Sequence, residues 1–122
     1  MKLNFDKVLM IDSHKRDISI LTVTYNSAKF ISDYFSSIKN CSVPAGYKLE
    51  ILIYDAGSSD ETVSIINNIQ KSTADVELIE GDNIGFASGN NLLAKKASGG
   101  YLFFLNPDTK LDTNCLSKLL FA

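Results

Sequence analysis

The feature that most constrains the fold is an alternation that begins at Asp17. From there, short runs of β-branched and aliphatic residues alternate with longer segments whose apolar residues recur at helical spacing. This rhythm is typical of βαβ units, in which helices join parallel strands. The predicted strands cover residues 18–24, 49–54, 76–79 and 101–105. Because these runs are apolar almost throughout, we expect helices on both faces of the sheet. The sequence predicts an α/β sandwich with a mostly parallel central sheet flanked by helices.

Polar residues mark where the helices should begin. The expected caps are Asn26 or Ser27 for the first helix, Ser58 with Glu61 in capping-box spacing for the second, and Asp112 for the last. The first helix should end before Pro44, and the third should cover about residues 86–97. We interpret residues 17–122 as one domain. Residues 1–16 are interpreted as an N-terminal extension that forms either an extra strand or a helix packed on the sheet edge.

Composition excludes several classes of protein. A chain of 122 residues, 45% hydrophobic and 21% charged, fits a single folded domain. Its net charge of −2 does not suggest a positively charged surface that would bind phosphates, so we expect no nucleic-acid partner. No apolar run is long enough to span a bilayer, and Cys41 and Cys115 lack the spacing of metal or redox pairs. We expect a cytoplasmic protein, which in full-length form could lie against the inner face of the membrane.

Polar clusters follow all four predicted strands. They are Tyr25-Asn26, Asp55, Asp82-Asn83 and Asn106-Pro107-Asp108. The carboxyl ends of parallel strands meet at one edge, where open α/β folds bind ligands, although loops of this kind are commonly polar for structural reasons alone. Pro107 fixes the backbone before Asp108, and Mg²⁺ and Mn²⁺ share oxygen ligands between carboxylates and substrate phosphates. We therefore predict that Asp108 binds a divalent metal, with a turn or capping carboxylate as the alternative.

Four segments carry a family resemblance. Residues 83–91 (NIGFASGNN) and 103–109 (FFLNPDT) resemble the signature of family 2 glycosyltransferases of the rhamnosyltransferase-like group. Residues 24–26 (TYN) and 55–60 (DAGSSD) resemble that family's first two motifs, in the same order. The resemblance extends from about Asp17 to the end of the chain. Any one motif would be weak, but four in order are specific.

The resemblance implies the GT-A (Rossmann-like) fold and transfer of a sugar, with inversion, from a UDP- or dTDP-type donor to a glycan or lipid-linked acceptor. Asp108 would bind the metal that bridges the diphosphate. Tyr25 and Asp55 would contact the base, with Asp60 near the same pocket. The nucleotide-sugar-binding residues implied by position are Thr24, Tyr25, Asn26, Asp55, Asp60, Asn83, Gly85, Phe86, Gly89, Asn90, Asn91 and Asn106.

Several of these residues also have a purely structural interpretation. Tyr25 could pack at the sheet edge, and Asp60 could be a first-turn carboxylate that complements a helix dipole. Gly85 and Gly89 could be helix-entry glycines. These alternatives stay open at the level of sequence.

The chain also departs from the family pattern. Ala56 stands where Asn is usual, which leaves base selectivity open, and Asn106 takes the first position of the metal motif. The family's general base lies in an acceptor-binding half beyond that motif. We therefore expect residues 1–122 to contain no catalytic base and not to transfer sugar alone.

Two other functions remain as alternatives to a transferase of polysaccharide biosynthesis. One is a non-catalytic nucleotide-binding or regulatory module of the same fold. The other, a receiver-type signalling domain, is disfavoured because residues 24–26 contain no carboxylate. The sequence is compatible with a homo-oligomer.

Overall fold

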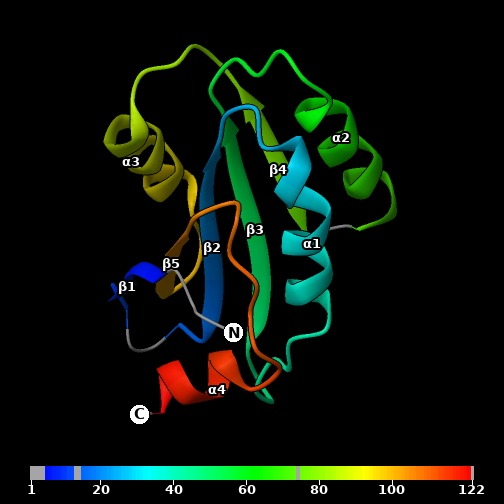
Figure 1. Ribbon diagram of the computed structural model, residues 1–122. Coiled ribbons are helices and arrows are strands. Elements are labelled where there is room, and N and C mark those ends of the chain that lie inside the picture. The colour runs from blue at the N-terminus through cyan, green and yellow to red at the C-terminus, as the bar shows by residue number, and fades with distance from the viewer. Residues whose placement is uncertain (1–4, 13–14, 74, 122) are drawn as a thin grey trace.

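The computed structural model describes residues 5–12, 15–73 and 75–121. Figure 1 shows a central sheet with helices on both sides. The elements in chain order are β1 (Phe5–Met10), β2 (Asp17–Thr24), α1 (Ala28–Lys39), β3 (Lys48–Asp55), α2 (Thr62–Ser72), β4 (Val76–Glu80), α3 (Phe86–Lys96), β5 (Tyr101–Leu105) and α4 (Cys115–Leu120). No helix in these ranges has the length and hydropathy needed to cross a bilayer.

The five strands form one sheet in the order β1-β5-β2-β3-β4. Strands β5, β2, β3 and β4 run parallel to one another, and β1 pairs antiparallel with β5. The predicted mostly parallel sheet is confirmed. Of the two forms open to the N-terminal segment, the structure shows the extra edge strand.

Each face of the sheet has its own hydrophobic cluster. Ile20 and Ile53 pack on one face with the buried residues of α1 and α4 and with Ile66 of α2. Leu21 and Leu52 pack on the other face with Leu93 of α3. Successive strand residues point to opposite faces, so burial of both sets explains why these strands are apolar throughout.

The predicted caps of the first two helices are only partly right. Ser27 occupies the N-cap position of α1 but makes no side-chain cap hydrogen bond. The capping box of α2 is wrong, because Glu61 is the N-cap residue and the Ser58 hydroxyl donates instead to the carboxylate of Asp55. The Ser58 hydroxyl donates its hydrogen to a charged acceptor, and its oxygen accepts from the N–H of Asn26 instead of from a helix N–H.

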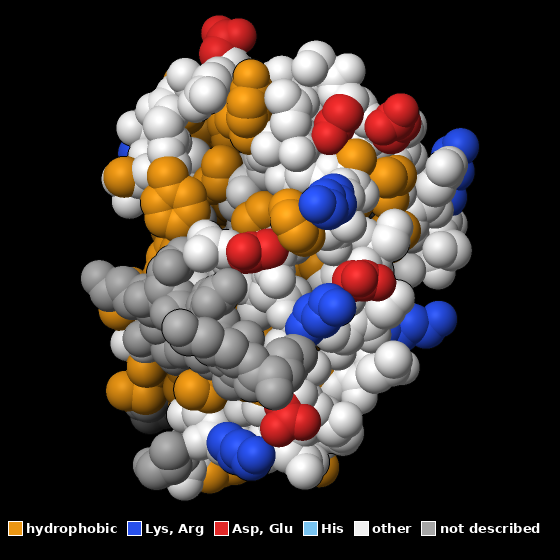
Figure 2. All heavy atoms as spheres, viewed as in Figure 1, with side chains coloured by type: hydrophobic (Ala, Val, Ile, Leu, Met, Phe, Trp, Pro, Cys, Tyr) orange, Lys and Arg blue, Asp and Glu red, His pale blue; other side chains and the backbone are white. Residues whose placement is uncertain are grey.

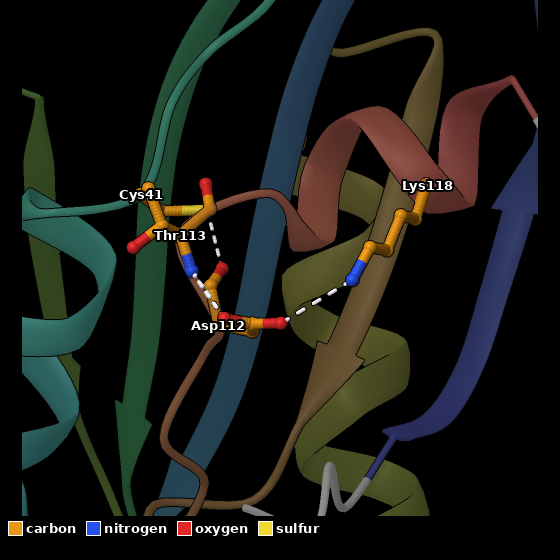
Figure 3. Close-up of polar contacts among 4 residues, drawn as sticks. All are labelled: Cys41, Asp112, Thr113 and Lys118. Atoms are coloured by element: carbon orange, nitrogen blue, oxygen red, sulfur yellow. Dashed lines mark hydrogen bonds and ion pairs between the residues drawn. The ribbon is translucent and has the colours of Figure 1, made fainter.

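The predicted cap of the last helix is wrong as well. Asn114 holds the N-cap position of α4, while the Asp112 carboxylate accepts from the backbone N–H of Thr113 and pairs with Lys118 at 3.4 Å. Figure 3 shows this arrangement beside Cys41, whose thiol lies 3.4 Å from the Asp112 carbonyl oxygen. These contacts fasten the start of α4 to the end of α1.

Charged side chains are interspersed over the surface drawn in Figure 2. Among the residues described there, Lys and Arg lie between Asp and Glu rather than in one patch. This pattern follows from a sequence with 12 basic and 14 acidic residues spread along its length.

Candidate functional site

The candidate site lies at the carboxyl edge of the sheet. Thr24, Asp55 and Glu80 are level with one another, so β2, β3 and β4 end side by side. Leu21 is level with Phe104, so β5 ends at Leu105 while β2 continues to Thr24. The chain order reverses at β2, with β3 on one side and β5 on the other. Open α/β sheets bind ligands at such a switch point.

Asp55 ends β3 and is only 1% exposed. Its Oδ1 accepts from the hydroxyls of Thr24 at 2.7 Å and Ser58 at 2.6 Å, and its Oδ2 accepts from the Ser58 N–H at 2.9 Å. Burial of a carboxylate is tolerated when donors surround it. Asp55 thus organises the start of the β3–α2 loop, and its predicted contact with a base remains a prediction.

Asn26 joins the loop after β2 to the loop after β3. Its backbone has a φ of 47°, a left-handed conformation that Asn tolerates better than most residues. Its side-chain oxygen accepts from the N–H groups of Ser59 at 2.8 Å and Asp60 at 3.3 Å. Its own N–H donates to the Ser58 hydroxyl at 2.8 Å. These contacts connect residues more than 30 positions apart.

Asp60 connects the first residues of two helices. One carboxylate oxygen accepts from both the N–H and the hydroxyl of Thr62, at 3.0 and 2.5 Å, and the other accepts from the N–H of Ala28 at 3.2 Å. The Thr62 hydroxyl is the main reason that the pKa of Asp60 lies below its ordinary value. The same hydroxyl accepts from the N–H of Ser27 at 2.8 Å. We call Asn26, Ala28, Ser59, Asp60 and Thr62 the cross-loop clip.

The structure revises two structural alternatives. Asp60 lies two residues before α2 rather than in its first turn, although it does bind the helix N-terminus. Tyr25 is 54% exposed, which does not fit a residue that only packs at the sheet edge.

The loop before α3 has an open approach. Gly85 is the N-cap residue with φ 90° and ψ 158°, and its N–H donates to Asn83 Oδ1 at 3.2 Å. A Cβ at Gly85 would meet no atom within 4 Å, and the first turn of α3 holds no acidic residue. Ile84 and Phe86 on either side are about half exposed. This helix N-terminus is therefore accessible to an anion.

The next turn of α3 contains three further predicted site residues, Gly89, Asn90 and Asn91. Gly89 faces the sheet, because a Cβ there would lie 2.9 Å from Val23 Cγ2, so its lack of a side chain serves helix packing. Asn90 is buried, and its Oδ1 has no hydrogen-bond partner among the described residues. Asn91 is exposed. The structure therefore places these three neighbours in three different environments.

The turn after β5 presents Asp108. The N–H of Thr109 donates to the carbonyl of Asn106 at 3.0 Å, and Thr109 is buried while Asp108 is exposed. Within the described ranges, no three His, Cys, Asp or Glu side chains group closely enough to hold a metal. A single carboxylate fits Mg²⁺ or Mn²⁺, which take further oxygen ligands from substrate phosphates and water. The donor set is compatible with such an ion bound together with a diphosphate.

A cavity lies elsewhere on the protein. A space of about 690 Å³ opens between the C-terminal parts of α1 and α2 and is lined by Phe35, Leu49, Ile69 and Val76, among others. Leu49 and Val76 belong to the amino-terminal ends of their strands, so this cavity is remote from the polar edge. Large apolar pockets are often binding sites. We nevertheless assign the site to the carboxyl edge, where the polar loops converge at the switch point.

Sequence reasoning missed Ser58 and Thr62. Both hydroxyls are central to the contacts between the two loops. Polar residues near a helix start are common, and no local pattern shows that their partners lie 32 and 35 positions away.

The chain is similar to known glycosyltransferases over most of its length. The family model for glycosyl transferase family 2 matches residues 19–122. An uncharacterized glycosyltransferase of Haemophilus influenzae is 32% identical over 84% of this chain and 40% of that protein. Poly-beta-1,6-N-acetyl-D-glucosamine synthase of Staphylococcus epidermidis is 32% identical over 88% of this chain and 26% of that protein. The chain thus spans well under half the length of these relatives.

Solved structures give the fold. S. aureus TarS 1–349 in complex with UDP-GlcNAc superposes with a TM-score of 0.76 at 22% identity, covering 85% of this chain and 30% of that one. Mannosyltransferase PcManGT from Pyrobaculum calidifontis, in complex with GDP-Man and Mn²⁺, superposes with a TM-score of 0.69 at 26% identity over 77% of this chain and 28% of that one. The predicted GT-A fold is confirmed. With its family match over residues 19–122, the chain belongs to glycosyl transferase family 2.

Proposed function

We propose that this chain binds a nucleoside-diphosphate sugar, of the UDP or dTDP type, at the carboxyl edge of its sheet. One observation carries the proposal: the exposed Tyr25 ring, the open N-terminus of α3 and the exposed Asp108 follow three different strands that end at this one edge. These features suit the three parts of such a ligand, since an aromatic ring can stack on a base and a helix N-terminus attracts phosphate.

In this proposal, different residues contact the base, the diphosphate and the sugar. Tyr25 and Asp55 contact the base, with Thr24 and Asn26 shaping the same loop. Asn83, Gly85 and Phe86 face the diphosphate, and Asn90 offers its unpartnered oxygen to a sugar hydroxyl, because a buried acceptor without a donor is costly. The remaining residues of the proposed binding site are Gly89, Asn91 and Asn106.

Asp108 would hold the divalent metal, with Asn106 beside it. A bound Mg²⁺ or Mn²⁺ supplies positive charge that stabilises the diphosphate as leaving group. The complex of PcManGT with GDP-Man and Mn²⁺ supports the choice of metal. TarS structures with UDP and UDP-GlcNAc support a uracil-type donor.

We propose that transfer to a glycan or lipid-linked acceptor, with inversion, takes place in a longer protein. The relatives are longer than the aligned region, which covers 40% or less of each of the two named above. Deprotonation of an acceptor hydroxyl requires a general base placed near the anomeric carbon. We assign that base to the acceptor-binding half and expect residues 1–122 alone not to form a glycoside.

A cytoplasmic location belongs to the same proposal. Cys41 and Cys115 are both free and buried, which suits a reducing compartment.

Calorimetry with UDP, dTDP and GDP tests the proposal. We expect UDP or dTDP to bind in Mn²⁺ and binding to weaken at least about tenfold in EDTA, equivalent to about 1.4 kcal/mol. Asp108→Asn should abolish the difference between Mn²⁺ and EDTA. Asp112→Asn is the matched control, because Asp112 is an exposed Asp near the next helix. Equal affinities with and without Mn²⁺ would contradict the metal role of Asp108, and no binding of any nucleotide would contradict the proposed function.

A further inference from the structure

The cross-loop clip includes Asn26, the residue that directly follows the exposed Tyr25. Thr24, on one side, donates to the buried Asp55 carboxylate. Asn26, on the other side, is held in its left-handed conformation and accepts from Ser59. The backbone is thus fastened before and after a ring that is 54% exposed. A rigidly mounted binding group loses less conformational freedom when a ligand arrives.

We propose that Asp60 is a positioning residue that sets the place of Tyr25 by tying the β2–α1 loop to the β3–α2 loop. It acts through the starts of two helices and does not touch the nucleotide. The inference rests on the proposed function, because the group being positioned is the ring that meets the base.

The contacts of Asp60 explain why a carboxylate occupies this position. Its two oxygens accept from different helices, Oδ1 from Thr62 and Oδ2 from Ala28. The N-termini of both helices carry partial positive charge, which a shared anion stabilises. An amide side chain has one accepting oxygen and could serve only one of the two helices in this geometry.

This division of contacts predicts different results for two substitutions. Asp60→Asn should keep the oxygen that faces Thr62 and lose the acceptor for Ala28. Amide hydrogen exchange should therefore accelerate at Ala28 but not at Thr62. Asp60→Ala should accelerate exchange at both. Glu61→Ala is the matched control, since its side chain takes no part in the clip, and it should change neither.

Binding measurements then test whether the clip affects the contact between the protein and the base. With Mn²⁺ present, Asp60→Ala should weaken UDP binding about tenfold, because small displacements of a binding group are costly. Pyrophosphate with Mn²⁺ shares the diphosphate and the metal but lacks the base, so its affinity should stay within about twofold of wild type. Asn26→Gly keeps the left-handed backbone accessible but removes the clip side chain, and it should repeat this pattern.

Several results would overturn the inference. Unchanged exchange at Ala28 and Thr62 in Asp60→Ala would show that the clip does not exist in solution. Faster exchange with unchanged UDP affinity would show that the clip does not position the base contact. Equal weakening of UDP and pyrophosphate would place Asp60 at the diphosphate or in general stability. Failure of wild-type protein to bind UDP would instead refute the proposed function, and the exchange data would still report on the clip.

Discussion

Removing the Asp55 carboxylate should destabilise the fold before it affects any ligand. Asp55 is 1% exposed and holds the hydroxyls of Thr24 and Ser58 and the N–H of Ser58. An unpaired buried donor costs about 1–3 kcal/mol. Thr24 is fully buried, whereas Ser58 is partly exposed and can turn to water. We therefore expect Asp55→Ala to lower the free energy of unfolding by about 1–3 kcal/mol, mainly through the stranded Thr24 hydroxyl.

Urea unfolding followed by circular dichroism measures this change. Asp82→Ala is the matched control: its carboxylate is on the exposed next loop, and its loss should change stability by less than about 0.5 kcal/mol. If Asp55→Ala cost less than about 1 kcal/mol while abolishing UDP binding, the carboxylate would be mainly a ligand contact and our account of the loop would be wrong.

Three further predictions test the surroundings of the site. Gly85→Ala should destabilise the protein by about 1–3 kcal/mol, because φ 90° with ψ 158° is a glycine conformation; an unchanged unfolding midpoint would refute this. Tyr34→Phe should cost about 1–3 kcal/mol by stranding the buried Thr22 hydroxyl 2.5 Å away, and adding Thr22→Val should recover part of the loss; strict additivity of the two changes would count against the pair. Burial raises the pKa of Cys115 to about 11, so iodoacetamide at pH 8 should label it slowly until urea unfolds the chain, whereas labelling as fast as a free thiol would place it at the surface.

The strands could be predicted closely from the sequence. The run predicted at 101–105 is β5 itself, and the run at 18–24 falls one residue short of β2. Residues 18–24 are rich in β-branched side chains and residues 101–105 are aromatic or aliphatic, and both compositions favour a strand that is covered on both faces. The shared edge of the polar strand ends could be predicted as well, because the carboxyl ends of parallel strands all lie on one edge of the sheet.

The contacts within the site could not be predicted. Ser58 has the spacing of a helix cap, yet its hydroxyl donates to Asp55 three residues earlier and accepts from the N–H of Asn26, 32 residues away. The partners of the Asn26 side chain and of Asp60 Oδ2 lie 32 to 34 residues away, on loops that meet only after β2 and β3 have paired. Gly89 likewise depends on Val23, a residue of another element. Tertiary contacts, rather than local preferences, decide the role of each of these residues.

A nuclear magnetic resonance titration with UDP and Mg²⁺ tests the central claim most directly. If the nucleotide binds at the carboxyl edge, the amide signals of ¹⁵N-labelled protein should shift most at Tyr25, Gly85 and Asp108 and their neighbours, and the shifts should saturate. The cavity between α1 and α2 provides the contrast, because its lining includes Leu49 and Val76 at the other end of the sheet. Saturable shifts centred on those residues, or no saturable shifts at all, would contradict the account.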